Sequence, residues 1–204
     1  MSTIKQALNQ TNGADKVRRD VVRFGNGERD FFHAEGTDED FAALTEILAK
    51  VAESPAQLKK MRDMPLDERP TLVISKGERS CYGYCSKTVL SVSKIAGTDY
   101  SAAATFAHEF QHQCQYVYGN AQRYLHAFSL KESILEERIG EAAAETAAYQ
   151  YLYDVKDNNP QAQAAYKAAF EKHGMRAYAV ARRKGESEPD CVLAGMRGLC
   201  GQSE

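Results

Sequence analysis

The segment SAAATFAHEFQHQCQYVYG, residues 101–119, constrains the fold more than any other part of the chain. If it is a helix, its apolar residues gather on one side, which predicts a helix that packs against a core. That side holds Ala103, Phe106, Phe110, Cys114 and Val117. His108 and His112 then lie one turn apart on the opposite side. The chain must therefore cover one side of this helix and leave the histidine side facing a cleft or solvent.

The histidine side has two interpretations. HEFQH matches H-E-x-x-H, a motif in which two histidines bind zinc and the glutamate is a general base. In a chain of this composition the motif would arise by chance roughly once in a hundred sequences, so the match needs support from its surroundings. The neighbours on that side, Ser101, Ala104, Thr105 and Gln115, are small or polar, as expected of a cleft. The alternative is a solvated helix face with two surface histidines. Such a face usually carries lysine or arginine, and neither occurs between Lys94 and Arg123. The pattern therefore favours a metal site.

The third metal ligand is less clear from the sequence. A catalytic zinc takes three protein ligands and keeps one position for water. Tyr118 stands where the extended motif would have a further histidine, which leaves Glu141, His126, and Glu137 or Glu145. Glu141 lies in EAAAETAAYQYLYDV, where alanines allow a close helix approach, and it shares a helical stripe with Ile134, Ala148 and Leu152. A carboxylate on an inward stripe needs a partner or a metal, so we favour Glu141. The opposing interpretation is an acidic surface row.

The rest of the chain predicts one mostly helical α+β domain with a small sheet ahead of the HEFQH helix. Residues 1–30 are polar and glycine-punctuated, and we expect a flexible arm; residues 31–204 form the domain, with its core at 70–155. Capping signals begin helices at Thr37, Ser54, Asp99 and Ser129. Strands are expected at 71–75 and 88–93, separated by a loop, and further helices at 161–173 and 175–184 before a short tail.

Composition excludes several classes of partner. The 204 residues carry a net charge of −2, which gives no basic surface for nucleic acid, and no apolar run is long enough for a membrane span. The first twenty residues lack the apolar region of a secretory signal, so we expect a cytoplasmic monomer, with export by another route left open. Five irregularly spaced cysteines fit reduced thiols.

Taken together, the strand TVLSVS, the segment AATFAHEFQHQCQ and the later EAAAETAAY resemble gluzincin-type zinc metallopeptidases, in particular small bacterial metallopeptidase-domain proteins. The resemblance covers residues 70–155. It implies a zincin-like fold in which His108, His112 and Glu141 bind Zn²⁺ and Glu109 is the general base. It also implies an endopeptidase whose protein or peptide substrate lies along an edge strand at 88–93.

No residue of the sequence is singled out as the group that stabilises the oxyanion. Tyr149, Tyr82, Tyr84 and His126 are the candidates, and Glu145 or Tyr149 could instead support a ligand from behind. Two other functions remain open at this point. One is a zincin-fold protein that binds metal and acts as a non-catalytic interaction module, and the other is a metal-free helical protein with a chance motif.

Overall fold

A computed structural model of the chain describes residues 16–75, 83–94, 99–119 and 130–200. The fold is α+β, as expected, with a five-stranded sheet and a larger set of helices. The strands are β1 (Arg18–Arg23), β2 (Phe31–Gly36), β3 (Thr71–Ser75), β4 (Gly83–Cys85) and β5 (Val89–Ser93). The helices are α2 (Asp38–Val51), α3 (Pro55–Asp63), α4 (Tyr100–Tyr118), α5 (Leu130–Val155), α6 (Pro160–Phe170), α7 (His173–Arg183) and α8 (Glu188–Cys200). A short 3₁₀ turn, Leu66–Glu68, precedes β3.

The sheet has the order β1-β2-β3-β5-β4. Strands β2, β3 and β5 are parallel, with Ala34 opposite Leu72 and Leu72 opposite Leu90, while β1 and β4 are antiparallel to their neighbours. Two predictions are wrong here. Residues 18–23 form β1 and are not part of a loose arm, and the strand at 88–93 is not an edge, because β5 is paired on both sides. The edge next to β5 is β4, Gly83–Cys85, within the segment expected to be a loop.

The core lies between the sheet and the helices α2 and α4. Alternate residues of the strands point into it, and they are met by the apolar sides of both helices. The central members of this core are Phe32, Leu72, Leu90, Leu44, Ile47, Phe106 and Phe110. The expected apolar side of α4 is confirmed: Phe106 and Phe110 are fully buried, and the Phe110 ring packs edge-on against Phe32 at 5.7 Å between centroids.

Helix starts follow the sequence signals where the structure describes them. Thr37 and Asp40 form the expected capping box, and the Asp99 carboxylate accepts from the backbone N–H of Ser101 and Ala102 at 2.8 and 3.1 Å. Helix α4 ends at Tyr118, with Gly119 as its C-cap. Ser129, the expected cap of α5, lies outside the described residues. None of the described helices is both long enough and apolar enough to span a bilayer.

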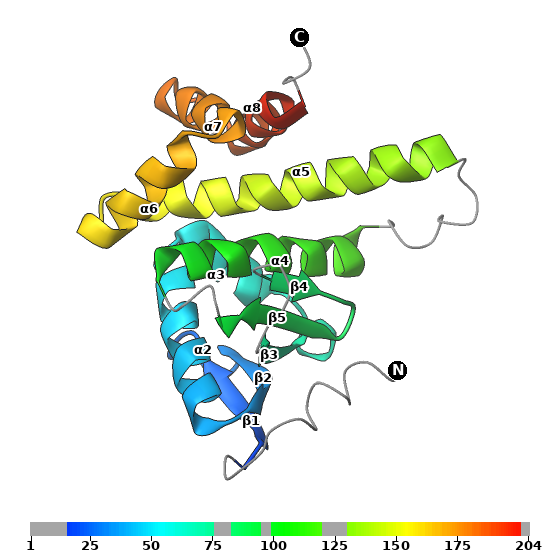
Figure 1. The fold of residues 1–204 in the computed structure, drawn as a ribbon, viewed down its shortest axis with the longest axis vertical. Helices are drawn as coiled ribbons and strands as arrows, with labels where there is room; N and C mark the ends of the chain where they lie inside the picture. The colour runs from blue at the N-terminus through cyan, green and yellow to red at the C-terminus, as the bar shows by residue number, and fades with distance from the viewer. Residues whose placement is uncertain (1–15, 76–82, 95–98, 120–129, 201–204) are drawn as a thin grey trace.

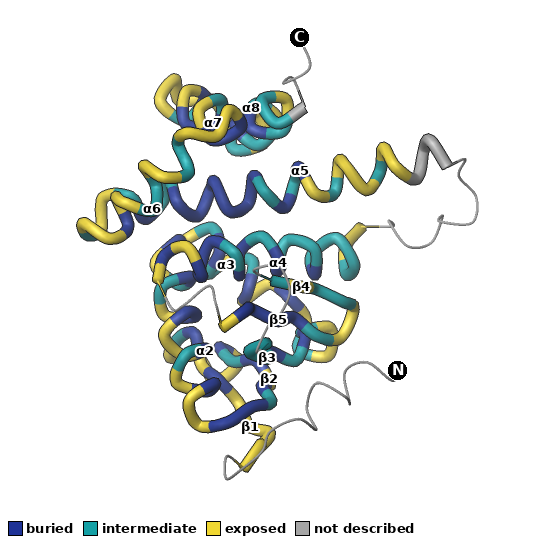
Figure 2. Tube along the Cα trace, in the orientation of Figure 1, coloured by how far each residue is buried: buried dark blue, intermediate teal, exposed yellow. Residues whose placement is uncertain are grey.

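Helix α5 runs alongside α4, and α7 and α8 pack on its other side (Figure 1). Its second half is mostly buried between these layers, whereas residues 134–141 are mostly exposed (Figure 2). The inward stripe expected on α5 is therefore only partly right: Ala148 and Leu152 are buried, but Ile134 is 43% exposed. The expected short tail is also wrong, because residues 188–200 form α8, which packs against α7 and α5.

Candidate metal centre

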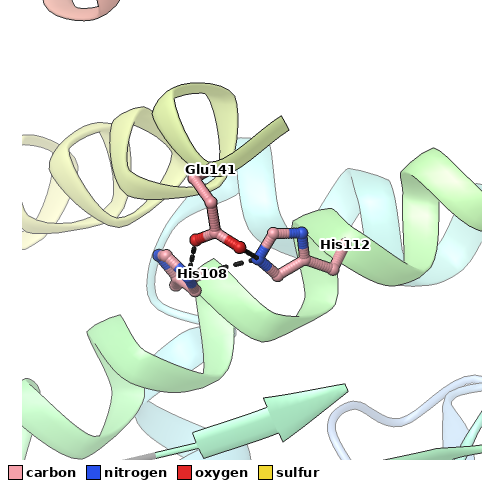
Figure 3. A group of neighbouring side chains, drawn as sticks. All are labelled: His108, His112 and Glu141. Atoms are coloured by element: carbon pink, nitrogen blue, oxygen red, sulfur yellow. Dashed lines mark hydrogen bonds and ion pairs between the residues drawn. The ribbon is translucent and has the colours of Figure 1, made fainter. Parts of the chain in front are cut away.

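Three predicted ligands come together where α5 runs alongside α4 (Figure 3). The Nε2 atoms of His108 and His112 are 3.3 Å apart. One Glu141 oxygen lies 3.5 Å from Nε2 of His108, and the other lies 3.4 Å from Nε2 of His112. In the part of the chain that the structure describes, this is the group of histidine, cysteine and acidic side chains that could hold a metal ion.

Small residues on α5 allow the two helices to approach. Ala144 and Ala148 are buried against α4, and Gly140 brings its carbonyl oxygen within 2.9 Å of the Gln115 side-chain nitrogen. Glu141 follows Gly140 directly and turns its carboxylate toward the histidines (Figure 3). Its side chain is 58% exposed. The sequence analysis favoured Glu141 because it expected this residue on a buried face, and that reason is wrong. Glu141 lies at the rim of the helix contact, open to solvent.

Each histidine has a partner behind it. Nδ1 of His112 lies 3.0 Å from the Gln115 side-chain oxygen, while the Gln115 nitrogen donates to the Gly140 carbonyl. The Gln115 oxygen can only accept, so His112 donates from Nδ1, and in the neutral ring the lone pair then lies on Nε2. Nδ1 of His108 lies 3.4 Å from a Glu145 oxygen, which directs Nε2 of this ring to the cluster as well. The contacts behind the rings thus orient both toward one point.

This arrangement also separates the alternative third ligands. Glu145 faces Nδ1 of His108, on the other side of the ring from the cluster, and therefore acts as an orienting group. The hydrogen bond with His108 lowers the pKa of Glu145 to about 2 against the opposing effect of burial, with Lys172 and Tyr149 contributing further. Glu137 is exposed on α5. His126 lies outside the described residues.

Tyr149 is buried beside Glu145. Its side chain is 1% exposed, and its hydroxyl donates to a Glu145 oxygen at 3.0 Å. Of the two roles considered for it, support of a ligand from behind fits these contacts, and stabilisation of an oxyanion does not. Tyr84 is 56% exposed on β4, and Tyr82 lies outside the described residues.

Glu109 lies beside the cluster, between α4 and β4. It is 8% exposed, and a side chain at Gly83 would come within 2.6 Å of Glu109 Cγ and 2.7 Å of its Oε1. The backbone of β4 therefore lies directly against the Glu109 carboxylate. Burial raises the pKa of Glu109 to about 7, an effect opposed by His108 and increased by Glu141. A carboxyl group held this way can accept or release a proton near neutral pH.

Sequence reasoning missed the close approach at Gly83, and it did not single out Tyr116. Tyr116 follows His112 by one helical turn and is half-buried. Burial raises the pKa of its hydroxyl, and Cys85, Tyr84, Glu109 and Glu141 raise it further, so Tyr116 lies near enough to Glu109 and Glu141 to feel their charges. The helical spacing from His112 to Tyr116 could have identified it. The Gly83 contact had no signal in the sequence, because it depends on where β4 pairs.

Comparison with protein-family models, with curated proteins and with solved structures gives no match for this chain.

Proposed function

We propose that the protein is a zinc-dependent endopeptidase in which His108, His112 and Glu141 bind Zn²⁺ and Glu109 is the general base. The observation that carries the proposal is the convergence of the three ligand groups. The two Nε2 atoms are 3.3 Å apart, and the two Glu141 oxygens lie 3.5 Å from Nε2 of His108 and 3.4 Å from Nε2 of His112, respectively. Zinc bound tetrahedrally at roughly 2.0–2.1 Å from nitrogen or oxygen holds neighbouring ligand atoms about 3.3–3.4 Å apart. The separation of the two nitrogens thus fits two corners of a zinc tetrahedron. Glu141 can supply a third, since one ligand atom from each of the three residues can be chosen with all three atoms within 4.8 Å of one another.

The chemistry of the donor set supports the same assignment. His112 presents a lone pair on Nε2 because its proton is used on Gln115, and Glu141 presents carboxylate oxygens to both rings. Two neutral imidazoles and a carboxylate that converge through their lone pairs repel one another, and a divalent cation removes that repulsion. Two imidazoles and one carboxylate are also the ligand set of a class of catalytic zinc sites.

Zinc at this position would supply Lewis acidity, which polarises a substrate carbonyl and makes water a better nucleophile. Glu109 can take a proton from the attacking water and pass it to the leaving amine, since its carboxylate is buried beside the cluster and is not among the ligands. Gly83 keeps β4 against this carboxylate. A purely structural zinc site would need no base in that position.

The substrate proposal is an extended segment of protein. Strand β4 pairs with β5 on one side. Among the residues that the structure describes it is the last strand of the sheet, so its other side offers backbone groups to a further strand. Since Gly83 touches Glu109, a peptide added along β4 would pass close to the base and the three ligands. In this proposal β4 takes the place that the sequence analysis gave to residues 88–93.

The test combines metal content with turnover. We expect about one zinc per chain by elemental analysis, lost in Glu141→Ala and kept in His126→Ala. Glu109→Gln should keep the zinc and lower hydrolysis of an unfolded protein substrate by about 10²–10⁴-fold, the usual contribution of a general base. Absence of zinc uptake, even when zinc is supplied, would overturn the metal site. If the wild type binds zinc but hydrolyses the substrate no faster than Glu109→Gln does, the protein is the non-catalytic interaction module instead.

A further inference from the structure

Glu145 connects the metal site to the C-terminal helices. One of its oxygens, Oε2, faces Nδ1 of His108 at 3.4 Å. The other, Oε1, accepts from Nζ of Lys172 at 2.6 Å and from the Tyr149 hydroxyl at 3.0 Å. The carboxylate is thus held by two donors on one oxygen, which leaves the second oxygen directed at the histidine.

Lys172 reaches this position from a segment that carries no recognisable motif. It is the residue that precedes α7, where the chain turns from α6 into α7. Its backbone N–H donates to the Ala169 carbonyl at 2.9 Å, which fixes the turn. Its side chain is 59% exposed, and its amine contacts the Glu145 carboxylate.

The start of α7 is held firmly against α5. A Cβ at Gly174 would come within 2.9 Å of the Tyr149 ring and 2.7 Å of Leu199 of α8, so only glycine permits this packing. Across the same layer, Gly195 of α8 leaves no room for a side chain beside Thr146 of α5. Since Lys172 is two residues before Gly174, this close packing sets where its amine can reach.

We propose that Lys172 is a positioning residue of the metal site. It acts through Glu145: the ammonium group fixes one carboxylate oxygen and balances its charge, so that the other oxygen orients the His108 ring toward the ligand cluster. This inference rests on the metal site of the proposed function. It gives α7 and α8 a part in metal binding, although both helices lie outside the segment 70–155 that holds the ligands.

The measurement is zinc affinity, determined on the full-length protein by competition with a chromophoric chelator. Losing an outer partner of a zinc-bound histidine typically weakens binding 10–100-fold, and we expect Lys172→Met to fall near the lower end, about 10-fold, because Tyr149 still holds Glu145. Lys172→Arg should restore wild-type affinity, because it keeps a cationic donor. The matched control is Lys167→Met, which removes the same charge from an exposed α6 lysine that bonds to Gln163. It should bind zinc as the wild type does.

A second readout separates positioning from general damage to the fold. With cobalt in place of zinc, the visible absorption band reports ligand geometry, and it should shift in Lys172→Met and not in Lys167→Met. Lys172→Gln should behave as Lys172→Met does, which covers the case in which one variant fails to fold.

Equal zinc affinity and equal cobalt spectra in wild type, Lys172→Met and Lys172→Gln would overturn the role of Lys172 and leave the proposed function intact. Failure of the wild type to bind zinc would overturn both. The two failures are therefore distinguishable in one series of titrations.

Discussion

One side of helix α4 carries Phe106 and Phe110, and the other carries His108 and His112. The phenylalanines stack on each other at 5.7 Å between ring centroids and meet Phe32 of β2. The histidines are 18–21% exposed, and their contacts are polar groups drawn from α4 itself and from α5. One side of α4 therefore needs no further partner once the chain has folded. The other side holds polar side chains that converge on one point.

The difference separates what stabilises the fold from what the site binds. Burial of the aromatic rings removes apolar surface from water and requires no further partner. The histidine side gains little from burial, and its Nε2 atoms face one another and a carboxylate. Variants on the two sides should therefore affect two different measurements, stability and metal binding.

The largest effect is expected at Phe110. Replacing this buried ring by alanine leaves a cavity between α4 and the sheet, so Phe110→Ala should lower the unfolding free energy of the zinc-free protein by about 3–5 kcal/mol. Urea denaturation measures this loss, and zinc affinity of the remaining folded protein should not change. His112→Ala should do the opposite. It should lose zinc binding, while the unfolding free energy of the zinc-free protein changes by no more than roughly 1 kcal/mol. Comparable destabilisation by both variants would show that the two sides are not separate.

The next effect concerns Gly83, which adjoins the same helix through Glu109. A methyl group at this position cannot fit beside the Glu109 carboxylate, so Gly83→Ala should displace either β4 or the base. A misplacement of about 1 Å can cost about 100-fold in rate, and we expect a fall of that order in kcat, with a smaller change in KM. Zinc affinity should stay at the wild-type value, because the atoms nearest to an added methyl group belong to Glu109 and Thr105 and not to a ligand. Loss of zinc in Gly83→Ala would mean that β4 supports the ligands as well as the base.

Much of this helix was predictable from sequence because its signals are local. Asp99 begins it, Gly119 follows its end, and the spacing of the apolar residues indicated its buried side. The outer strands were not predicted. Strand β1 is mostly exposed and charged, as edge strands often are, and β4 has three residues, so pairing across the sheet and not local preference defines both.

The site shows the same limit. HEFQH identified His108, His112 and Glu109, and alanines around Glu141 indicated a close helix approach, which the structure shows near Gly140 and Ala144. The contacts that orient the rings were not predictable, because they depend on how α5 lies on α4 and α7 lies on α5. Gln115 was visible as part of the motif, but its bond to the Gly140 carbonyl, which determines the His112 tautomer, requires both helices.

The smallest of these effects is expected at Gln115, and it gives the sharpest comparison along α4. Gln115→Ala removes the acceptor for Nδ1 of His112, so zinc affinity should fall by about 10-fold, as for other outer partners of zinc-bound histidines. Gln111→Ala is the matched control, because Gln111 lies one turn earlier and accepts from Lys60 at 3.1 Å, with no bond to a histidine. Chelator competition should detect the difference between the two glutamine variants. If both weaken zinc equally, the effect comes from the helix surface as a whole, and the His112 tautomer assigned here is wrong. If only Gln115→Ala does so, the histidine side of α4 depends on individual bonds, in contrast to the collective packing of the aromatic side.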